Sequence, residues 1–325
     1  MTDQVLLDTA ERLFRDHCDK DRWDRAERGE FAQDLWQALK DNGFIDMGLP
    51  DSGFALADTY AILRIAGQHA APLALAEFLL GARWTGQSEH RVSIGYAAAA
   101  QTAAQVPWGR SVEQVLMLPA DSGPAATLED QIALPLLQVE TGRGTEGVNI
   151  AGEPRDTVQG VVDGAIDVQS PYALLSLARA VQMSGAMTTI LEMALQYATE
   201  RSQFGRTISK FQAIQHSLAV TAAEVAAAQR ASDSAVAALD SERFVDDLAA
   251  AKARVGEAAG TVAELAHQVH GAMGFTHEHQ LHHFTRRLWA WRDEFGHEGE
   301  WQALLGARIA AGGADQAWGF IASRA

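Results

Sequence analysis

A short basic segment, residues 200–212, holds the clearest candidate binding residues of the sequence. It reads ERSQFGRTISKFQ and places Arg201, Arg206 and Lys210 around a glycine turn, in a chain where 42 acidic residues face 26 basic ones. The pattern predicts that a new helix begins near Ser209, whose hydroxyl can cap it. Guanidinium groups and free N–H groups at a helix start suit a phosphate or another anion. By composition alone, a solvated loop between two helices explains the same residues.

Residues 268–275, QVHGAMGF, form a second candidate loop. Its glycines would let backbone N–H groups approach a ligand closely. Stripes of apolar residues at helical spacing flank both loops and predict alanine-rich helices packed as an antiparallel bundle. The expected helical stripes cover residues 171–205, 211–225, 248–269, 281–291 and 298–323.

The chain before this bundle divides into a helical part and a β-prone part. Residues 1–85 carry apolar side chains at helical spacing, whereas residues 86–170 alternate short β-prone pieces with Gly, Pro, Asp and Thr. We therefore expect a mostly α-helical protein with a small central β domain. The predicted parts are an N-terminal helical domain (1–85), the β domain (86–170) and a C-terminal four-helix bundle (171–325).

The residue order of both loops resembles the acyl-CoA dehydrogenase family. The pattern Arg-x-x-Phe-Gly-x-x-Ile-x-x-Phe-Gln begins at Arg201, and residues 268–275 resemble the family's Gln-x-x-Gly-Gly-x-Gly-Phe loop. Residues 48–53 and 289–296 add further likeness, so the resemblance covers nearly the whole chain. It implies the family's α–β–α fold and a flavoenzyme that oxidises the α–β bond of an acyl-CoA thioester and passes electrons to an electron-transfer flavoprotein.

The resemblance also implies a set of cofactor-binding residues. In this family two subunits share each FAD, and the bundle motifs reach the cofactor of the neighbouring subunit. Arg201 and Gln203 would hold the pyrophosphate, because paired guanidinium donors match two phosphate oxygens. Ala272 stands where the family usually has glycine. The implied set is Arg201, Gln203, Phe204, Phe211, Gln212, Gln268, Gly271 and Ala272.

Other features of the family are missing from the sequence. Residues 86–170 lack the Thr-Glu-Pro-x-Ala-Gly-Ser and Trp-Ile-Thr segments that hold the flavin ring and the thioester. We therefore expect a truncated β domain that does not hold the reactive half of a flavin. The family's catalytic glutamate aligns with Phe295, and the alternative base position aligns with Leu175. Glu294 stands one residue early, which rotates a helical side chain by about 100°. We expect no catalytic base in this chain, and Glu294 is the candidate if one exists. As a non-catalytic residue, Glu294 is expected to form an ion pair with Arg292 or Arg286.

This combination resembles the short, non-catalytic subunit of heteromeric bacterial acyl-CoA dehydrogenases of lipid metabolism and steroid degradation. The expected partner is a longer acyl-CoA dehydrogenase subunit in a heterotetramer, and the expected ligands are a shared FAD and an acyl-CoA substrate that the sequence does not identify. A self-sufficient homo-oligomeric dehydrogenase that uses Glu294 is the alternative interpretation.

Two further observations bound the function. Seven of the 11 histidines cluster after residue 266, and Glu264-x-x-His267 with Glu294-x-x-His297 imitates the motif of di-metal carboxylate bundles, with Glu192 and Glu224 on other helices. Chance accounts for such pairs, so we expect no metal and keep this bundle as a remote alternative. A net charge of −16 and a single cysteine, Cys18, predict a cytoplasmic protein that binds neither nucleic acid nor membranes.

Overall fold

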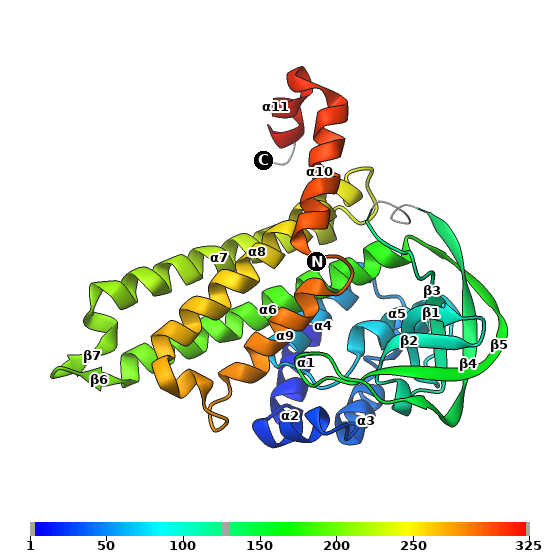
Figure 1. Ribbon diagram of the computed structural model, residues 1–325, viewed down its shortest axis with the longest axis horizontal. Coiled ribbons are helices and arrows are strands. Elements are labelled where there is room, and N and C mark those ends of the chain that lie inside the picture. Colours follow the sequence, from blue (N-terminus) through cyan, green and yellow to red (C-terminus); the bar gives the residue numbers. More distant parts are fainter. Residues whose placement is uncertain (1–3, 125–129, 323–325) are drawn as a thin grey trace.

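The computed structural model describes residues 4–124 and 130–322, and Figure 1 shows their arrangement. Helices form both ends of the chain, and a small β-barrel lies between them in sequence, so the predicted fold class is confirmed. In Figure 1 the N-terminal helices lie below the bundle and to the left of the barrel. They are α1 (Gln4–His17), α2 (Lys20–Glu27), α3 (Gln33–Asp41), α4 (Leu56–Gln68) and α5 (Leu75–Thr85), with a 3₁₀ turn, η1 (Asp46–Gly48).

The barrel closes in the strand order β1-β2-β5-β4-β3. Strands β1 and β3 are parallel, and the other neighbouring pairs are antiparallel. Val106, Val115 and Leu137 are among the side chains that fill its interior, since a barrel this small has room for side chains only. The strands are β1 (Val92–Ala99), β2 (Thr102–Pro107), β3 (Gln114–Leu118), β4 (Gln131–Thr145) and β5 (Arg155–Gln169), with a 3₁₀ turn, η2 (Gly109–Ser111), before β3.

The bundle is built around helix α6, which contacts α4, α7, α8 and α9. Many of its contact residues are alanines and glycines, and small side chains let helices approach closely. Helix α6 is long and apolar enough to cross a membrane, yet 78% of its most apolar window is buried inside the protein, as expected for a core helix. The bundle helices are α6 (Pro171–Glu200), α7 (Gln212–Ala237), α8 (Phe244–His270) and α9 (Leu281–Asp293).

The C-terminal segment differs from the sequence expectation of one final helix. It forms α10 (Glu298–Gly312), which packs on α8, and α11 (Ala314–Ala322), which folds back beside α10. Gly313 separates them with φ +79, a left-handed conformation that a helix cannot continue through. Both helices project from the body of the molecule in Figure 1.

Candidate functional site

The basic segment forms a hairpin at the end of the bundle that lies far from the barrel (Figure 1). Strands β6 (Ser202–Gln203) and β7 (Arg206–Thr207) pair, and Phe204 and Gly205 form the tip with φ of +53 and +79. A 3₁₀ turn, η3 (Ile208–Lys210), then leads to α7. We call residues 201–212 the hairpin.

The predicted capping role of Ser209 is wrong. Helix α7 begins at Gln212, its N-cap residue is Phe211, and no side chain caps it. The Ser209 hydroxyl instead pairs with the hydroxyl of Thr207 at 3.0 Å, because Ser209 lies within the 3₁₀ turn and α7 begins three residues later. The first N–H groups of α7 are therefore not consumed by a side-chain cap.

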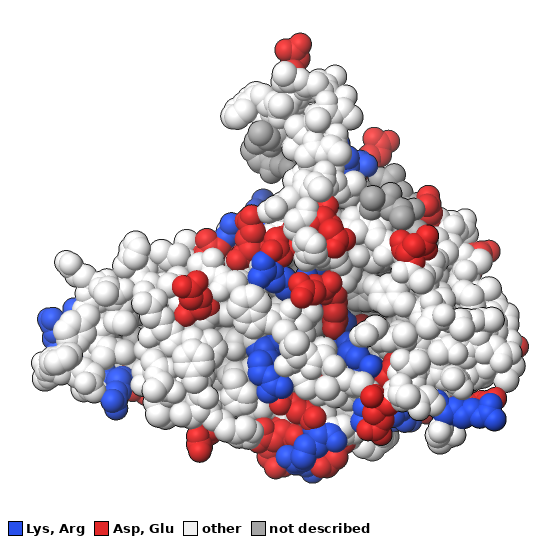
Figure 2. All heavy atoms as spheres, viewed as in Figure 1, with Lys and Arg blue, Asp and Glu red and all other residues white. Residues whose placement is uncertain are grey.

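The hairpin presents exposed cations that lack acidic partners. Arg201, Arg206 and Lys210 form no ion pair with any residue that the structure describes, and all three are exposed. The Arg206 guanidinium lies 4.2 Å from the centre of the Phe211 ring, and Phe204, 92% exposed, contacts the same ring edge-on at 6.1 Å. Figure 2 shows Lys and Arg at this end of an otherwise acidic molecule. The hairpin is thus a cationic, aromatic surface available to an anion.

The second loop lies at the same end of the bundle. Helix α8 ends at His270, and a 3₁₀ turn, η4 (Gly271–Phe275), follows it. His270 stacks on Tyr197, one turn before the end of α6, with ring centres 4.6 Å apart. Because α6 and α8 end side by side, the structure brings the hairpin and this loop to one end of the bundle (Figure 1).

The predicted cofactor residues are open to a ligand from outside. Gln203, Gln212, Gln268, Gly271 and Ala272 are exposed, and Phe211 is half-buried. Nothing lies within 4 Å of a methyl group built on Gly205 or Gly271, so there is space beside both turns. Unpaired guanidinium groups, amide side chains and free N–H groups form a donor set that fits the phosphates and adenosine of FAD.

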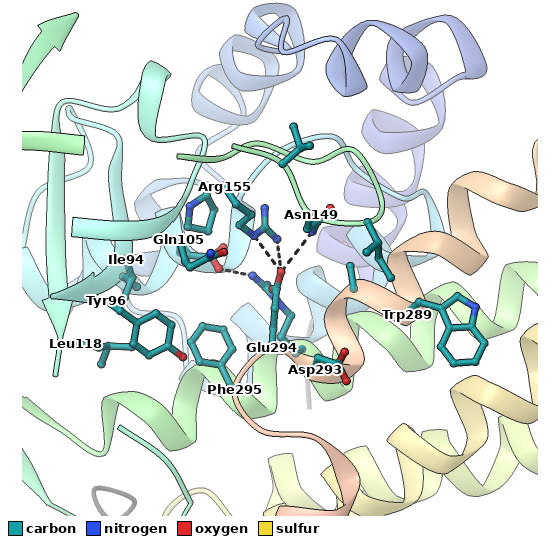
Figure 3. A pocket seen from close by; sticks show the side chains of 16 residues that line it. Ile94, Tyr96, Gln105, Leu118, Asn149, Arg155, Trp289, Asp293, Glu294 and Phe295 are labelled. Carbon is teal, nitrogen blue, oxygen red and sulfur yellow. Dashed lines mark hydrogen bonds and ion pairs between the residues drawn. The ribbon is translucent and has the colours of Figure 1, made fainter. Parts of the chain in front are cut away.

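The other predicted residue, Glu294, lies at the opposite end of α9, beside the barrel. It lines a pocket of about 390 Å³ between the barrel and the bundle, shown in Figure 3. Apolar and aromatic side chains form much of the wall, and charged groups meet on one side. The pocket residues labelled there are Ile94, Tyr96, Gln105, Leu118, Asn149, Arg155, Trp289, Asp293, Glu294 and Phe295.

Glu294 is held by two buried arginines. One carboxylate oxygen accepts from Arg155 Nη2 at 2.6 Å, and the other accepts from Arg179 Nε at 2.5 Å. Arg179 also donates to Glu77, whose side chain is fully buried. The predicted partners were wrong, because Arg292 pairs with Glu298 and Arg286 pairs with Glu27.

These ion pairs determine the protonation of Glu294. Burial alone would raise its pKa, but Arg155 and Arg179 lower the pKa to about 2. A carboxylate this weakly basic, with both oxygens already engaged, is poorly suited to remove an α-proton. The aligned base positions, Phe295 and Leu175, are both buried and carry no ionisable group.

A buried lysine fixes the turn that carries Glu294. Lys252 of α8 donates to the backbone oxygen of Glu294 at 2.8 Å, and burial lowers its pKa to about 7. Phe295 has φ +56 and packs edge-on against Tyr172. Together these contacts hold the end of α9 in one conformation.

Sequence reasoning missed the arginine side of this network. Arg155 is the first residue of β5, while Arg179 and Glu77 interrupt apolar runs of buried helices. A single charged residue in an apolar run predicts an oppositely charged partner in the core, because an unpaired charge is costly to bury. That signal was present in the sequence, but nothing in it identified which charges pair.

The histidine-rich region provides no metal centre. Among the residues that the structure describes, no group of three or more His, Cys, Asp or Glu side chains could hold a metal ion. Glu294 pairs with arginines and Glu224 pairs with Arg254, so two of the four candidate glutamates have other partners. This finding gives the di-metal alternative no support.

Comparisons with known proteins agree with the fold and the motifs. Residues 168–297 match the family model "Acyl-CoA dehydrogenase, C-terminal domain". The chain is similar to acyl-CoA dehydrogenase IpdE2 of Mycolicibacterium smegmatis, at 23% identity over 301 residues that cover 87% of this chain and 91% of IpdE2.

Two similar solved structures come from two-component complexes. One belongs to the ChsE4-ChsE5 complex from Mycobacterium tuberculosis, with a TM-score of 0.79, 18% identity and coverage of 95% of this chain and 98% of that chain. The other is a Tcur3481-Tcur3483 steroid ACAD variant, with a TM-score of 0.77, 21% identity and the same coverage. The likeness shows an acyl-CoA dehydrogenase fold. Residues 168–297 therefore belong to the acyl-CoA dehydrogenase C-terminal domain family, and the chain as a whole is similar to acyl-CoA dehydrogenases, a family of FAD-dependent oxidoreductases.

Proposed function

We propose that this chain is the short subunit of a heteromeric acyl-CoA dehydrogenase and supplies the adenosine and pyrophosphate side of an FAD site to a longer catalytic partner. The observation that carries the proposal is the difference in ion pairing between the arginines of the hairpin and those of the barrel pocket. Arg201 and Arg206 of the hairpin are exposed and form no ion pair with an acid that the structure describes, whereas the arginines of the barrel pocket are buried in ion pairs. Cations without partners favour an anionic ligand.

We assign the cofactor contacts as the resemblance to the family implies them. Arg201 and Gln203 would bind the pyrophosphate, and Phe204 would pack on the cofactor from the hairpin tip. Gln268 and the turn at Gly271 and Ala272 would meet the adenosine end. Phe211 and Gln212 would lie beside the cofactor. When bound, FAD supplies the acceptor for a hydride from the substrate, and this chain binds and orients its outer half.

The barrel pocket supports a non-catalytic role for this chain. Its two arginines are already engaged by Glu294 and Glu77, so neither guanidinium group is free to bind a flavin ring or a thioester. The catalytic base and the reactive end of the flavin would then come from the longer subunit. The homo-oligomeric alternative requires Glu294 as a base, and its low pKa and two arginine partners argue against that role.

The two complexes named above motivate the partner and the substrate. We propose a heterotetramer that acts on a bulky acyl-CoA, of the steroid class that the Tcur3481-Tcur3483 name states, with electrons passing to an electron-transfer flavoprotein. The substrate pocket in this proposal lies mainly in the longer subunit. A cytoplasmic location without nucleic-acid or membrane partners remains the prediction from composition.

The test compares the chain expressed alone with the chain co-expressed with a candidate longer subunit. We expect little FAD in the chain alone and stoichiometric FAD in the co-purified complex, measured by flavin absorbance per polypeptide. The control is the longer subunit alone, which should also bind little FAD if both chains form the site. A chain that purifies alone with one FAD per polypeptide would contradict the proposal.

A further inference from the structure

Three histidines lie beneath the turn that carries the predicted adenosine contacts. His270 is buried between the ring of Tyr197 and the ring of His279, each with its centre 4.6 Å away. His267 stacks on Phe275, the last residue of the turn, at 4.5 Å. We call His267, His270 and His279 the histidine cluster.

The turn packs directly on two of these histidine side chains. A methyl group built on the buried Gly274 would lie 2.9 Å from His270 Cβ and 3.2 Å from His267 Nδ1. Both distances are shorter than ordinary contacts, so glycine at this position lets the turn rest on the histidine side chains. Any movement of His267 or His270 must therefore move the backbone of η4.

The hydrogen bonds of the cluster leave nitrogen atoms buried and unpartnered. His270 Nδ1 donates to the backbone oxygen of Ala266 at 2.7 Å, so the neutral ring carries its lone pair on Nε2, which is buried without a partner. His267 Nε2 lies 3.0 Å from the hydroxyl of Thr285, and its Nδ1 is buried without a partner. A proton added to either free nitrogen would be a charge without a hydrogen-bond acceptor.

The surroundings of the cluster disfavour charge. Helix α6 contributes the phenol of Tyr197 and helix α9 contributes the hydroxyl of Thr285. The nearby carboxylates, Glu200 after Tyr197 and Glu278 beside His279, are exposed, and Glu200 accepts from Gln196 instead. No carboxylate on these elements is recorded in contact with the three rings among the residues that the structure describes.

The pKa values follow from this environment. Burial lowers the pKa of His267 and His270 from the ordinary value of 6.5, and repulsion from His279 lowers both further. Burial also lowers the pKa of His279. All three rings are therefore neutral at pH 7 and above.

We propose that the histidine cluster positions the Gly271–Phe275 turn and holds it closed only while its rings are neutral, so that mildly acidic pH opens the turn and releases the cofactor contacts that it carries. The cofactor part of this inference rests on the proposed function. The positioning of the turn by the histidines does not.

The direction of the pH effect follows from proton linkage. An open turn exposes the histidines and returns their pKa values toward 6.5, so the open form binds more protons than the closed form. The stability of the closed turn is fully present above about pH 6.5 and decreases as pH falls toward the lowered values. Acid therefore favours opening.

The first experiment measures hydrogen exchange of the full chain without FAD at pH 7.5 and 5.5. The readout is the protection factor, which removes the intrinsic pH dependence of exchange, for residues 268–276, with the core of α6 as an internal reference. We expect about a tenfold loss of protection in the turn at pH 5.5, equivalent to about 1.4 kcal/mol.

The matched variants are His270→Phe and His216→Gln. Phenylalanine keeps a ring against Tyr197 but takes no proton, so we expect the loss at pH 5.5 to shrink to about threefold or less. His216 lies exposed on α7 near the same end of the bundle, and its variant should behave as wild type. His279→Gln, at a half-buried position, gives the same test if His270→Phe does not fold. Equal protection at both pH values in the wild type, or the same loss in His270→Phe, would overturn the inference.

The second experiment measures the FAD dissociation constant of the co-purified complex at both pH values. We expect the ratio between pH 5.5 and 7.5 to be about tenfold for wild type and smaller for His270→Phe. If the turn opens at pH 5.5 in the first experiment but the FAD dissociation constant does not change with pH, only the inferred release of cofactor contacts would be overturned. An unchanged turn in the first experiment refutes the positioning role whatever FAD does.

Discussion

The arginines at the two ends of the bundle differ in exposure and in ion pairing. At the hairpin, Arg201 and Arg206 stand exposed on a two-stranded turn, and no described acid pairs with them. At the barrel, Arg155 and Arg179 are buried and share the carboxylate of Glu294, and Arg179 also binds Glu77. Arginine is thus exposed at one end of the bundle, whereas at the other end it links buried carboxylates.

The contrast teaches where a ligand is still expected. A buried arginine must be paired within the protein, because leaving it unpaired costs more than the pair returns. An exposed arginine costs little free energy when it is unpaired. Its hydrogen bonds contribute more free energy when a ligand excludes water from the guanidinium group. We therefore expect an anionic ligand at the hairpin end rather than at the barrel end.

The largest expected effect comes from breaking the barrel network at its centre. Arg179→Ala leaves the fully buried Glu77 without its partner and leaves Glu294 with Arg155 alone. Loss of one member of a buried pair costs about 3–5 kcal/mol, and we expect a loss of this size in the free energy of unfolding, measured with urea.

The control for this change is Arg143→Ala. Arg143 pairs with Glu140 at 2.9 Å on the exposed end of β4, so its loss should cost no more than about 1 kcal/mol. Equal losses in the two variants would show that the barrel network contributes no more than a surface pair, and the comparison between the two ends would fail.

Helix packing could be predicted from the sequence, whereas the long-range ion pairs could not. The helix stripes predicted the bundle because each helix buries one apolar face with a regular period, as in residues 248–269. The two loop motifs lie at one end of the folded bundle because antiparallel helices bring alternate connections together.

The barrel network was beyond the sequence. Arg155 and Glu294 are separated by most of the bundle in the chain and meet only after the barrel packs on α9. The helix period predicted that Glu294 would turn away from a base position, but it could not name its partners. The histidine cluster was visible as composition, while its role beneath η4 depends on the ring contacts of the folded chain.

The next effect concerns the hairpin. Arg201→Ala should raise the FAD dissociation constant of the co-purified complex, because each charge-assisted hydrogen bond to a phosphate contributes about 1.5–3 kcal/mol. That range corresponds to a factor of about 10 to 150. Arg201→Lys should restore only part of the affinity, since an ammonium group cannot bind two oxygens in the planar geometry of guanidinium.

Arg12→Ala is the matched control for the hairpin, because Arg12 is an exposed arginine of α1 and its loss changes the net charge equally. An FAD affinity that falls equally in both variants would reflect net charge alone. Unchanged affinity in the Arg201→Ala complex would remove the hairpin from the cofactor site.

The smallest expected effect is on turnover after Glu294→Gln, and it separates a supporting subunit from an enzyme in its own right. Glutamine keeps the shape of the side chain but cannot neutralise Arg155 and Arg179, so the variant should lose stability. Turnover of the intact complex, normalised to bound FAD, should nevertheless stay within about tenfold of wild type, because the base in this proposal belongs to the longer subunit.

The normalisation decides the result, because weaker assembly also lowers the apparent rate. A true base takes part in the reaction, and its loss removes about 100- to 10,000-fold in rate. We therefore compare Glu294→Gln with Arg155→Lys, which disturbs the same ion pairs and keeps the carboxylate. If normalised turnover fell about a thousandfold in Glu294→Gln alone, with FAD content and oligomer intact, Glu294 would be the base and the chain would be a catalytic subunit.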